Sequence, residues 1–296
     1  MPQITKIPPH FSIVKNKNTT LYVKKEYKEF ISDIIAHTHP SKTDNSGSFM
    51  VKQGRGRYLS VPIKKNGEER LIIRNYKHGG LLGKIFGNVF LNGNRPFNEI
   101  NIHEVALQNG VPSAEAIAIA KRKILGGFYS ADFITKEISG AVDLMHFLAE
   151  HPAEYIRESK KSVILVIAGL IRKMHDVGIY HADLHLKNIL VKKNPDGAFE
   201  AYIIDLDKST VLPQLTLSKR MKNLLRLDRS LEKYYWLQRK KTGKELFPIS
   251  KTDRMRFFKA YMANGTEMGR NWKAHIRQYY SSHTFHKFWW RVLRLS

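Results

Sequence analysis

The sequence predicts an α+β chain in two parts: a first part built on an antiparallel sheet with a helix, and a second part that is mainly helical. Short β-type runs separated by glycine and asparagine turns dominate residues 49–138. Residues 163–174 instead carry apolar side chains at helical spacing. The chain has no cysteine, so neither part can depend on disulfides or on cysteine-ligated zinc.

A chain of 296 residues is long enough for two lobes with sizeable cores. Ser139-Gly140 interrupts the β-type pattern, so we place the boundary there, with a first lobe over residues 1–138 and a second over 139–296. The residues up to about 48 are mixed and poorly periodic, and we expect them to form a variable start to the first lobe.

Turn signals divide the first lobe into its elements. Asn66-Gly67 is the signal of a hairpin, Gly110 ends a helical rhythm, and Gly126-Gly127 separates two β-type runs. We expect strands at 49–51, 58–63, 71–74, 114–124 and 128–138, and a helix at 96–109.

The main helix of the second lobe has its apolar residues on one face. They follow the spacing i, i+3, i+4, i+7, i+8 and i+11: Val163, Val166, Ile167, Leu170, Ile171 and Met174. Ser162 is the expected cap and Gly178 the expected end. Short strands at 189–191 and 199–204 and then basic helices complete the lobe.

The stretch 181–188 carries the chemistry. It reads His-Ala-Asp-Leu-His-Leu-Lys-Asn, and a β-type run ends at Asp205, seventeen residues after Asn188. An Asp, an Asn five residues later and an Asp at a strand end follow the order of a phosphotransferase catalytic loop. We expect Asp183 to take the proton of an acceptor hydroxyl, and Asn188 and Asp205 to bind Mg²⁺. The order predicts a kinase that uses ATP and Mg²⁺.

A different reading uses the two histidines that flank Asp183. His181 and His185 could form an H-x-D-x-H metallohydrolase site. Such sites need about three protein ligands, and the sequence places no second histidine pair nearby. We therefore favour the kinase and expect His181 to brace the loop backbone.

Four residues of the first lobe are expected to bind the nucleotide. Gly54 and Gly56, in Gly-Arg-Gly between two strands, would let backbone N–H groups approach phosphate oxygens. Arg74 ends the third expected strand, where a kinase holds phosphates with a cation, and Glu99 on the following helix could pair with it.

The charge distribution predicts a polyanionic partner. The net charge is +24, and residues 208–296 hold 21 Lys or Arg against 5 Asp or Glu, together with all four tryptophans. Nucleic acid, an anionic membrane or a phosphorylated glycolipid would each be attracted. No nucleic-acid motif accompanies the charge, so we expect no nucleic acid. With no signal peptide or membrane-length apolar run, we expect a cytoplasmic protein.

Several longer stretches resemble one family, the lipopolysaccharide core kinases, and most closely its Kdo kinases, which act on the inner-core sugar. The resemblance covers about residues 49–235 and is most specific in two stretches: the Arg-x-Tyr-x-x-Gly-Gly-Leu run that starts at Arg74, and Arg229-Ser230-Leu231-Glu232-Lys233. The middle of the catalytic loop, residues 184–187, departs from the usual pattern, and residues after about 236 have no counterpart.

The resemblance implies a protein-kinase-like bilobal fold, ATP and Mg²⁺ as cofactors, and a sugar hydroxyl as acceptor. It implies Asp183 as the base, Asn188 and Asp205 as magnesium ligands, and Arg74 with Glu99 at the phosphate site. The expected acceptor is Kdo–lipid A; the alternatives are a heptose kinase of the same core, or a polyanion-binding pseudokinase.

Two further expectations concern the basic surface. A platform of Lys219, Arg220, Lys222, Arg226 and Arg229 suits an anionic acceptor. The basic aromatic stretch 234–296 is expected either to lie on the inner face of the inner membrane or to be an ordinary packed helical region.

Overall fold

The structure of the protein is a computed structural model. It describes residues 7–37, 50–53, 57–63, 69–76, 88–91, 95–243 and 249–262. The chain divides into two compact units: the first contains Met1–Leu107 and Ala114–Ser139, and the second contains Gln108–Ser113 and Gly140–Ser296. Each is described by itself.

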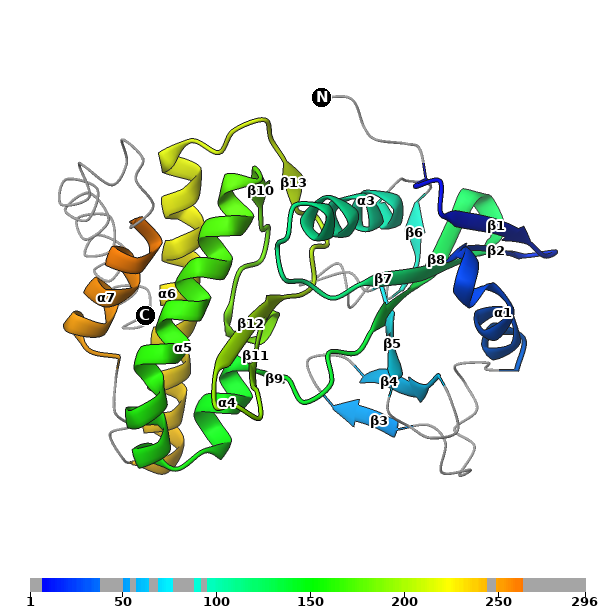
Figure 1. The fold of residues 1–296 in the computed structure, drawn as a ribbon. Helices are drawn as coiled ribbons and strands as arrows, with labels where there is room; N and C mark the ends of the chain where they lie inside the picture. Colours follow the sequence, from blue (N-terminus) through cyan, green and yellow to red (C-terminus); the bar gives the residue numbers. More distant parts are fainter. Residues whose placement is uncertain are drawn as a thin grey trace, which may run out of the picture. The chain divides into compact units, whose positions relative to one another are not determined.

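The first unit is built on one antiparallel sheet (Figure 1). Its strands follow the spatial order β1-β2-β7-β8-β5-β4-β3, and β6 also pairs with β8. The strands are β1 (Phe11–Lys15), β2 (Thr19–Lys24), β3 (Met50–Gln53), β4 (Arg57–Pro62), β5 (Arg70–Asn75), β6 (Phe90–Leu91), β7 (Ala116–Lys123) and β8 (Phe128–Lys136).

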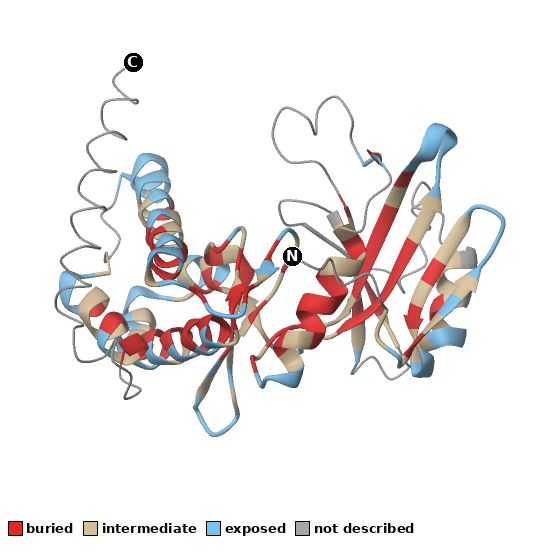
Figure 2. Ribbon diagram, turned by 90° about the horizontal axis from the view of Figure 1, so that it is seen from above, coloured by how far each residue is buried: buried red, intermediate tan, exposed pale blue. Residues whose placement is uncertain are grey.

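Both faces of this sheet are covered by a helix. Ile31 of α1 (Lys28–His37) belongs to a core cluster with Ile134 of β8, whereas Ile100 of α3 (Arg95–Gln108) clusters with Phe133, the preceding residue of the same strand. Neighbouring residues of a strand point to opposite faces, so the two helices lie on opposite sides. The central strands and α3 are accordingly buried (Figure 2).

Within the expected variable start of the first lobe, residues 11–37 form β1, β2 and α1. β1 lies at the edge of the sheet, and of its five residues only Phe11 is buried. Because an edge strand is largely exposed to water, its sequence carries little hydrophobic alternation. This is why no strand was predicted at β1.

The second unit is mainly helical, which confirms the predicted α+β class. Its helices are α4 (Leu144–Glu150), α5 (Ala153–Asp176), α6 (Leu217–Thr242) and α7 (Lys251–Met262). A small sheet has the order β12-β11-β9, and β10 pairs with β13. These strands are β9 (Val142–Asp143), β10 (Ile179–Tyr180), β11 (Ile189–Lys193), β12 (Phe199–Ile203) and β13 (Thr210–Val211).

The apolar face predicted for the main helix is the buried face of α5. Five of its six residues are buried, and Val166 is half-buried. The predicted start at Ser162 was wrong, because α5 begins at Ala153 directly after Pro152. Its first turns are mostly polar residues, which are compatible with a helix but leave no apolar periodicity to detect.

Candidate active site

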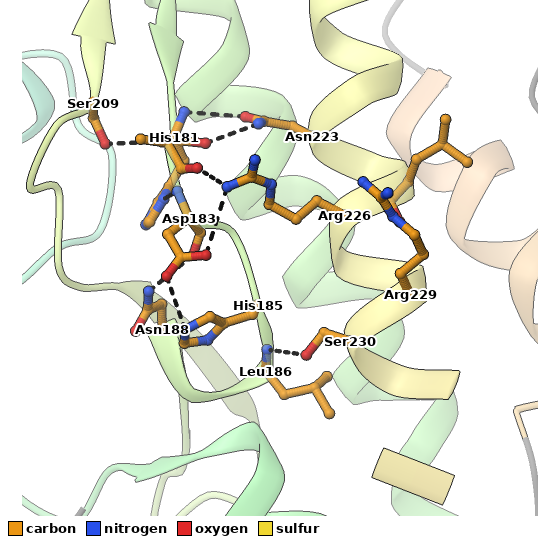
Figure 3. Close-up of polar contacts among 12 residues, drawn as sticks. His181, Asp183, His185, Leu186, Asn188, Ser209, Asn223, Arg226, Arg229 and Ser230 are labelled. Atoms are coloured by element: carbon orange, nitrogen blue, oxygen red, sulfur yellow. Dashed lines mark hydrogen bonds and ion pairs between the residues drawn. The ribbon is translucent and has the colours of Figure 1, made fainter. Parts of the chain in front are cut away.

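The predicted catalytic loop lies in the second unit, between β10 and β11, where Asp183 holds an exposed carboxylate (Figure 3). Its side chain is 60% exposed. Its Oδ2 lies 3.4 Å from Nε2 of His185, and its Oδ1 lies 3.6 Å from Nη1 of Arg226. The contact with His185, joined by the charge of Arg226, outweighs partial burial and lowers the pKa of Asp183 below its usual value. Asp183 is therefore ionised at neutral pH and can act only as an acceptor.

His181 holds the loop from inside. It is fully buried, its Nε2 donates to the carbonyl oxygen of Ile204 at 3.1 Å, and its Nδ1 accepts from the backbone N–H of Asp183 at 3.1 Å. These two bonds require one neutral tautomer, and burial lowers the pKa of His181 to about 4. The prediction that His181 braces the backbone is confirmed. Both of its ring nitrogens are engaged, which leaves neither for a metal.

Side chains on one face of α6 form hydrogen bonds with the backbone of the catalytic loop (Figure 3). Asn223 accepts from the N–H of His181 at 3.1 Å and donates to its carbonyl at 2.9 Å. Arg226 donates to the carbonyl of Ala182, and the Ser230 hydroxyl accepts from the N–H of Leu186 at 3.2 Å. The spacing i, i+3, i+7 puts these three side chains on one side of the helix.

A further hydroxyl, that of Ser209, accepts from the N–H of Ala182 at 3.2 Å. The loop-holding roles of Asn223, Ser209 and Ser230 were not predicted from the sequence. Each contact joins residues 27 to 44 positions apart. No local sequence pattern predicts a contact over that separation.

Asn188 and Asp205 are brought together by a hairpin. Ile189 of β11 pairs with Ile203 of β12, and the N–H of Ile204 donates to the carbonyl of Asn188 at 3.0 Å. Asp205 follows directly, in the left-handed backbone region with a φ of 59°. Few residues other than glycine adopt this conformation, so the backbone places this carboxylate at a conformational cost.

The chemistry of these two side chains fits Mg²⁺, which prefers oxygen ligands. Asn188 is buried, and its Nδ2 donates to the carbonyl of Asp183 at 2.9 Å, which turns its Oδ1 away from that bond. The described residues contain no group of three or more His, Asp or Glu side chains that could enclose a metal. An ion held here would therefore complete its coordination with water and nucleotide phosphates, as Mg²⁺ commonly does.

In the first unit, Arg74 and Glu99 form the predicted ion pair. Nη2 of Arg74 lies 2.6 Å from Oε1 of Glu99, and the Tyr76 hydroxyl donates to Oε2 of the same carboxylate. The Glu99 side chain is fully buried, whereas that of Arg74 is 32% exposed. Burial raises the pKa of Glu99, but Arg74, His103 and Tyr76 together more than offset it, so the pKa ends below its usual value.

Two of the expected residues cannot be placed. Gly54 and Gly56 lie outside the described residues, so their expected contact with phosphates stays a prediction.

The predicted basic platform needs one correction. Arg220 is buried and its Nη1 lies 2.7 Å from Oδ1 of Asp176, so it is an internal ion pair and not part of the surface. Lys219, Lys222 and Arg229 are exposed, and Arg226 is half-buried.

Of the basic aromatic stretch 234–296, the structure describes residues up to 243 and 249–262, and Trp236 is the one tryptophan among them. No helix in the described part of the chain has the length and apolarity that crossing a bilayer requires.

Comparisons with known proteins show the family of the chain. The family model "Lipopolysaccharide kinase (Kdo/WaaP) family" matches residues 45–261. A relative named 3-deoxy-D-manno-octulosonic acid kinase, from Vibrio cholerae serotype O1, is 30% identical over 219 residues, which are 70% of this chain and 86% of the relative. A protein of the same name from Vibrio vulnificus (strain YJ016) is 34% identical over 185 residues, 61% of this chain and 71% of that protein.

A solved structure titled "WaaP in complex with acyl carrier protein" has a TM-score of 0.55, covering 89% of this chain and 98% of its own. At 16% identity this likeness concerns the fold, which is protein-kinase-like. The catalytic-loop geometry and the match over residues 45–261 lead to one conclusion: the chain belongs to the lipopolysaccharide kinase (Kdo/WaaP) family and is an ATP-dependent phosphotransferase.

Proposed function

We propose that this protein transfers the γ-phosphoryl group of ATP to a hydroxyl of Kdo on lipid A. The observation that carries the proposal is the ionised, exposed carboxylate of Asp183 on a loop fixed from behind by His181 and by α6. The identity of 30–34% with relatives named 3-deoxy-D-manno-octulosonic acid kinase supports Kdo as the acceptor sugar.

In this reaction Asp183 orients the acceptor hydroxyl and accepts its proton as the oxygen attacks phosphorus. Asn188 and Asp205 would hold Mg²⁺, which when bound would neutralise charge on the phosphates. Arg74, oriented by the buried carboxylate of Glu99, contributes a guanidinium that matches phosphate geometry. Gly54 and Gly56 would cover the phosphates.

We place the reaction at the cytoplasmic face of the inner membrane, with the protein bound peripherally. The lipid anchor of the proposed acceptor and the net charge of +24 support this location, because basic surfaces are drawn to anionic lipids. Nucleic acid is not an expected partner.

The test is a product assay with purified protein, ATP and Mg²⁺. Kdo–lipid A, a heptosylated core glycolipid and a general protein acceptor are offered separately, and the products are mapped by mass spectrometry. We expect one phosphate on Kdo. Transfer only to heptose would identify a heptose kinase, transfer only to protein would identify a protein kinase, and no transfer to any of these acceptors would favour the pseudokinase.

A further inference from the structure

One face of α6 carries a stripe of basic residues beside the catalytic loop. The positions i, i+3, i+7, i+10 and i+14 share a face of a helix, and here they hold Lys219, Lys222, Arg226, Arg229 and Lys233. Arg226 is half-buried and the other four are exposed. We call this set the basic stripe.

The acidic residues of α6 do not neutralise this stripe. α6 has two of them, and both face Arg254 of α7: Oδ1 of Asp228 lies 2.9 Å from its Nε, and Oε1 of Glu232 lies 3.3 Å from its Nη2. Among the described residues, the one ion pair made by the stripe joins Arg226 to Asp183. The four exposed residues of the stripe therefore carry uncompensated positive charge, and Arg226 is the member that contacts the loop. Arg229 points away from the loop, and its Nε donates to the carbonyl of Leu225 at 3.2 Å (Figure 3).

Arg226 stands out because it is fixed in place. Its Nη1 donates to the carbonyl of Ala182 and lies 3.6 Å from Oδ1 of Asp183 (Figure 3). A guanidinium has five N–H donors in a planar fork, so this anchoring leaves donors for a second partner. A carboxylate is the partner whose geometry such a fork matches.

The reacting hydroxyl of the acceptor must lie against Asp183, which puts its neighbouring substituents beside Arg226. An octulosonic acid carries a carboxylate. We propose that Arg226 binds the carboxylate of the acceptor sugar and so determines specificity for an acidic sugar, while the rest of the stripe holds further anionic groups of the glycolipid. This inference rests on the proposed function, because it assumes that Asp183 faces the acceptor.

The experiment compares two acceptors and three proteins. The acceptors are Kdo–lipid A and the same glycolipid with the sugar carboxylate converted to its primary amide, which keeps size but removes charge. The proteins are wild type, Arg226→Gln, and the control Arg157→Gln, which removes an exposed charge near the start of the 24-residue helix α5, whose opposite end leads into β10 and the loop. Both kcat/KM and the Kd for each glycolipid in detergent micelles without ATP are measured.

For wild type we expect kcat/KM and affinity to fall about 10- to 100-fold when the carboxylate becomes an amide, as for loss of a charge-assisted hydrogen bond. Arg226→Gln should show a similar loss with the carboxylate acceptor and little further loss with the amide. Arg157→Gln should behave like wild type. The two changes would thus be non-additive, which is the sign of direct contact.

Equal losses on both acceptors would show that Arg226 only positions the loop, and the inference would be wrong although the function stands. Arg226→Lys guards against misfolding, because it keeps the charge; it should retain part of the preference for the carboxylate. If wild type phosphorylates neither glycolipid, the proposed function is wrong. The Kd values of wild type and Arg226→Gln for the two glycolipids would still show whether Arg226 binds the carboxylate.

Discussion

At the scale of single residues, the carboxylate of Asp183 lies between the imidazole of His185 and the guanidinium of Arg226. His185 and Arg226 favour its ionised form and lower its pKa below the usual value, so in its proposed role Asp183 would be a weaker base. Phosphoryl transfer passes through a loose transition state and depends mainly on positioning and electrostatics. A weak but well-oriented base therefore suits the reaction.

Replacing Asp183 by Asn should lower kcat by about 10²–10⁴-fold, because the amide cannot take the proton of the hydroxyl. The side chain is exposed, so the urea midpoint of unfolding should stay close to that of wild type. Phosphate transfer to Kdo–lipid A and urea unfolding are measured in parallel. An unchanged turnover would remove Asp183 from the role of base.

The buried pair of the first unit allows a matched comparison. Glu99→Gln leaves Arg74 beside a neutral group, and we expect the free energy of unfolding to fall by about 2–4 kcal/mol, less than for a fully buried pair because Arg74 is partly exposed. Glu69 lies at the same 2.6 Å from Lys136, but both side chains are partly exposed. Glu69→Gln should cost less than about 1 kcal/mol.

Urea unfolding measures both variants, and the KM for ATP is recorded beside it. Glu99→Gln should also raise the KM for ATP, because Arg74 loses its orientation. Equal losses of unfolding free energy in Glu99→Gln and Glu69→Gln would show that the burial of Glu99 does not increase the contribution of its ion pair to stability.

At the scale of elements, α5 and β10 are joined through Gly178, where a side chain would collide with a neighbouring backbone. Gly178 has a φ of 86°, and a Cβ built on it would lie 1.9 Å from the carbonyl oxygen of Leu212. Gly197 has the same φ of 86° in the β11–β12 turn, yet a Cβ there meets nothing within 4 Å.

Alanine at these two glycines separates backbone strain from steric conflict. Gly197→Ala should cost about 1–2 kcal/mol, the cost of the left-handed conformation. Gly178→Ala should cost clearly more, because the Leu212 backbone must move and β10 leads directly into the catalytic loop. Urea unfolding gives both values. Similar losses would mean that the backbone at Leu212 moves aside at little cost in free energy.

The sequence could predict elements where the pattern is local. The buried face of α5 and the order Asp183, Asn188, Asp205 can be recognised within short stretches of the sequence. The pairing of Arg74 with Glu99, 25 positions apart, was expected from the kinase pattern of a strand-end cation and an acidic residue on the next helix. The loop contacts of Asn223 and Ser230 could not be predicted, because their partners lie 42 and 44 positions away. Neither could the burial of Arg220, which depends on Asp176 of another helix.

At the scale of the whole molecule, buried neutral histidines connect the helices of the second unit to the loop. His175 of α5 donates through Nε2 to Oδ1 of Asn223 at 3.2 Å and accepts at Nδ1 from the hydroxyl of Tyr261 at 2.7 Å. Burial lowers the pKa of His175 to about 3, and that of His181 to about 4. Asn223 thereby joins α5 and α7 to the catalytic loop.

These pKa values predict that the protein loses stability as the pH falls from 7 to 5. The unfolded chain binds protons on these histidines near pH 6.5 and the folded protein does not, so the free energy of unfolding decreases on acidification. Each histidine should contribute a loss of about 2 kcal/mol between pH 7 and pH 5. The carboxylates whose pKa is lowered titrate below this range.

Urea unfolding at both pH values checks this. His175→Gln should reduce the difference between pH 7 and pH 5, whereas His146→Gln, at an exposed position of α4, should not. The same pH difference in His175→Gln as in wild type would contradict the assignment. If that variant does not fold, NMR titration of the wild-type imidazoles should show His175 and His181 uncharged down to pH 5.

The left-handed backbone at Asp205 has a consequence for reading distant members of this family. Glycine adopts this φ at a lower conformational cost than aspartate does, so the Asp205 carboxylate is held there against the local backbone preference. Asp205→Gly should be inactive in phosphate transfer and at least as resistant to urea as wild type. A homologue with glycine at this position would therefore lack the carboxylate but have less backbone strain. We would expect it to bind its ligand without transferring phosphate.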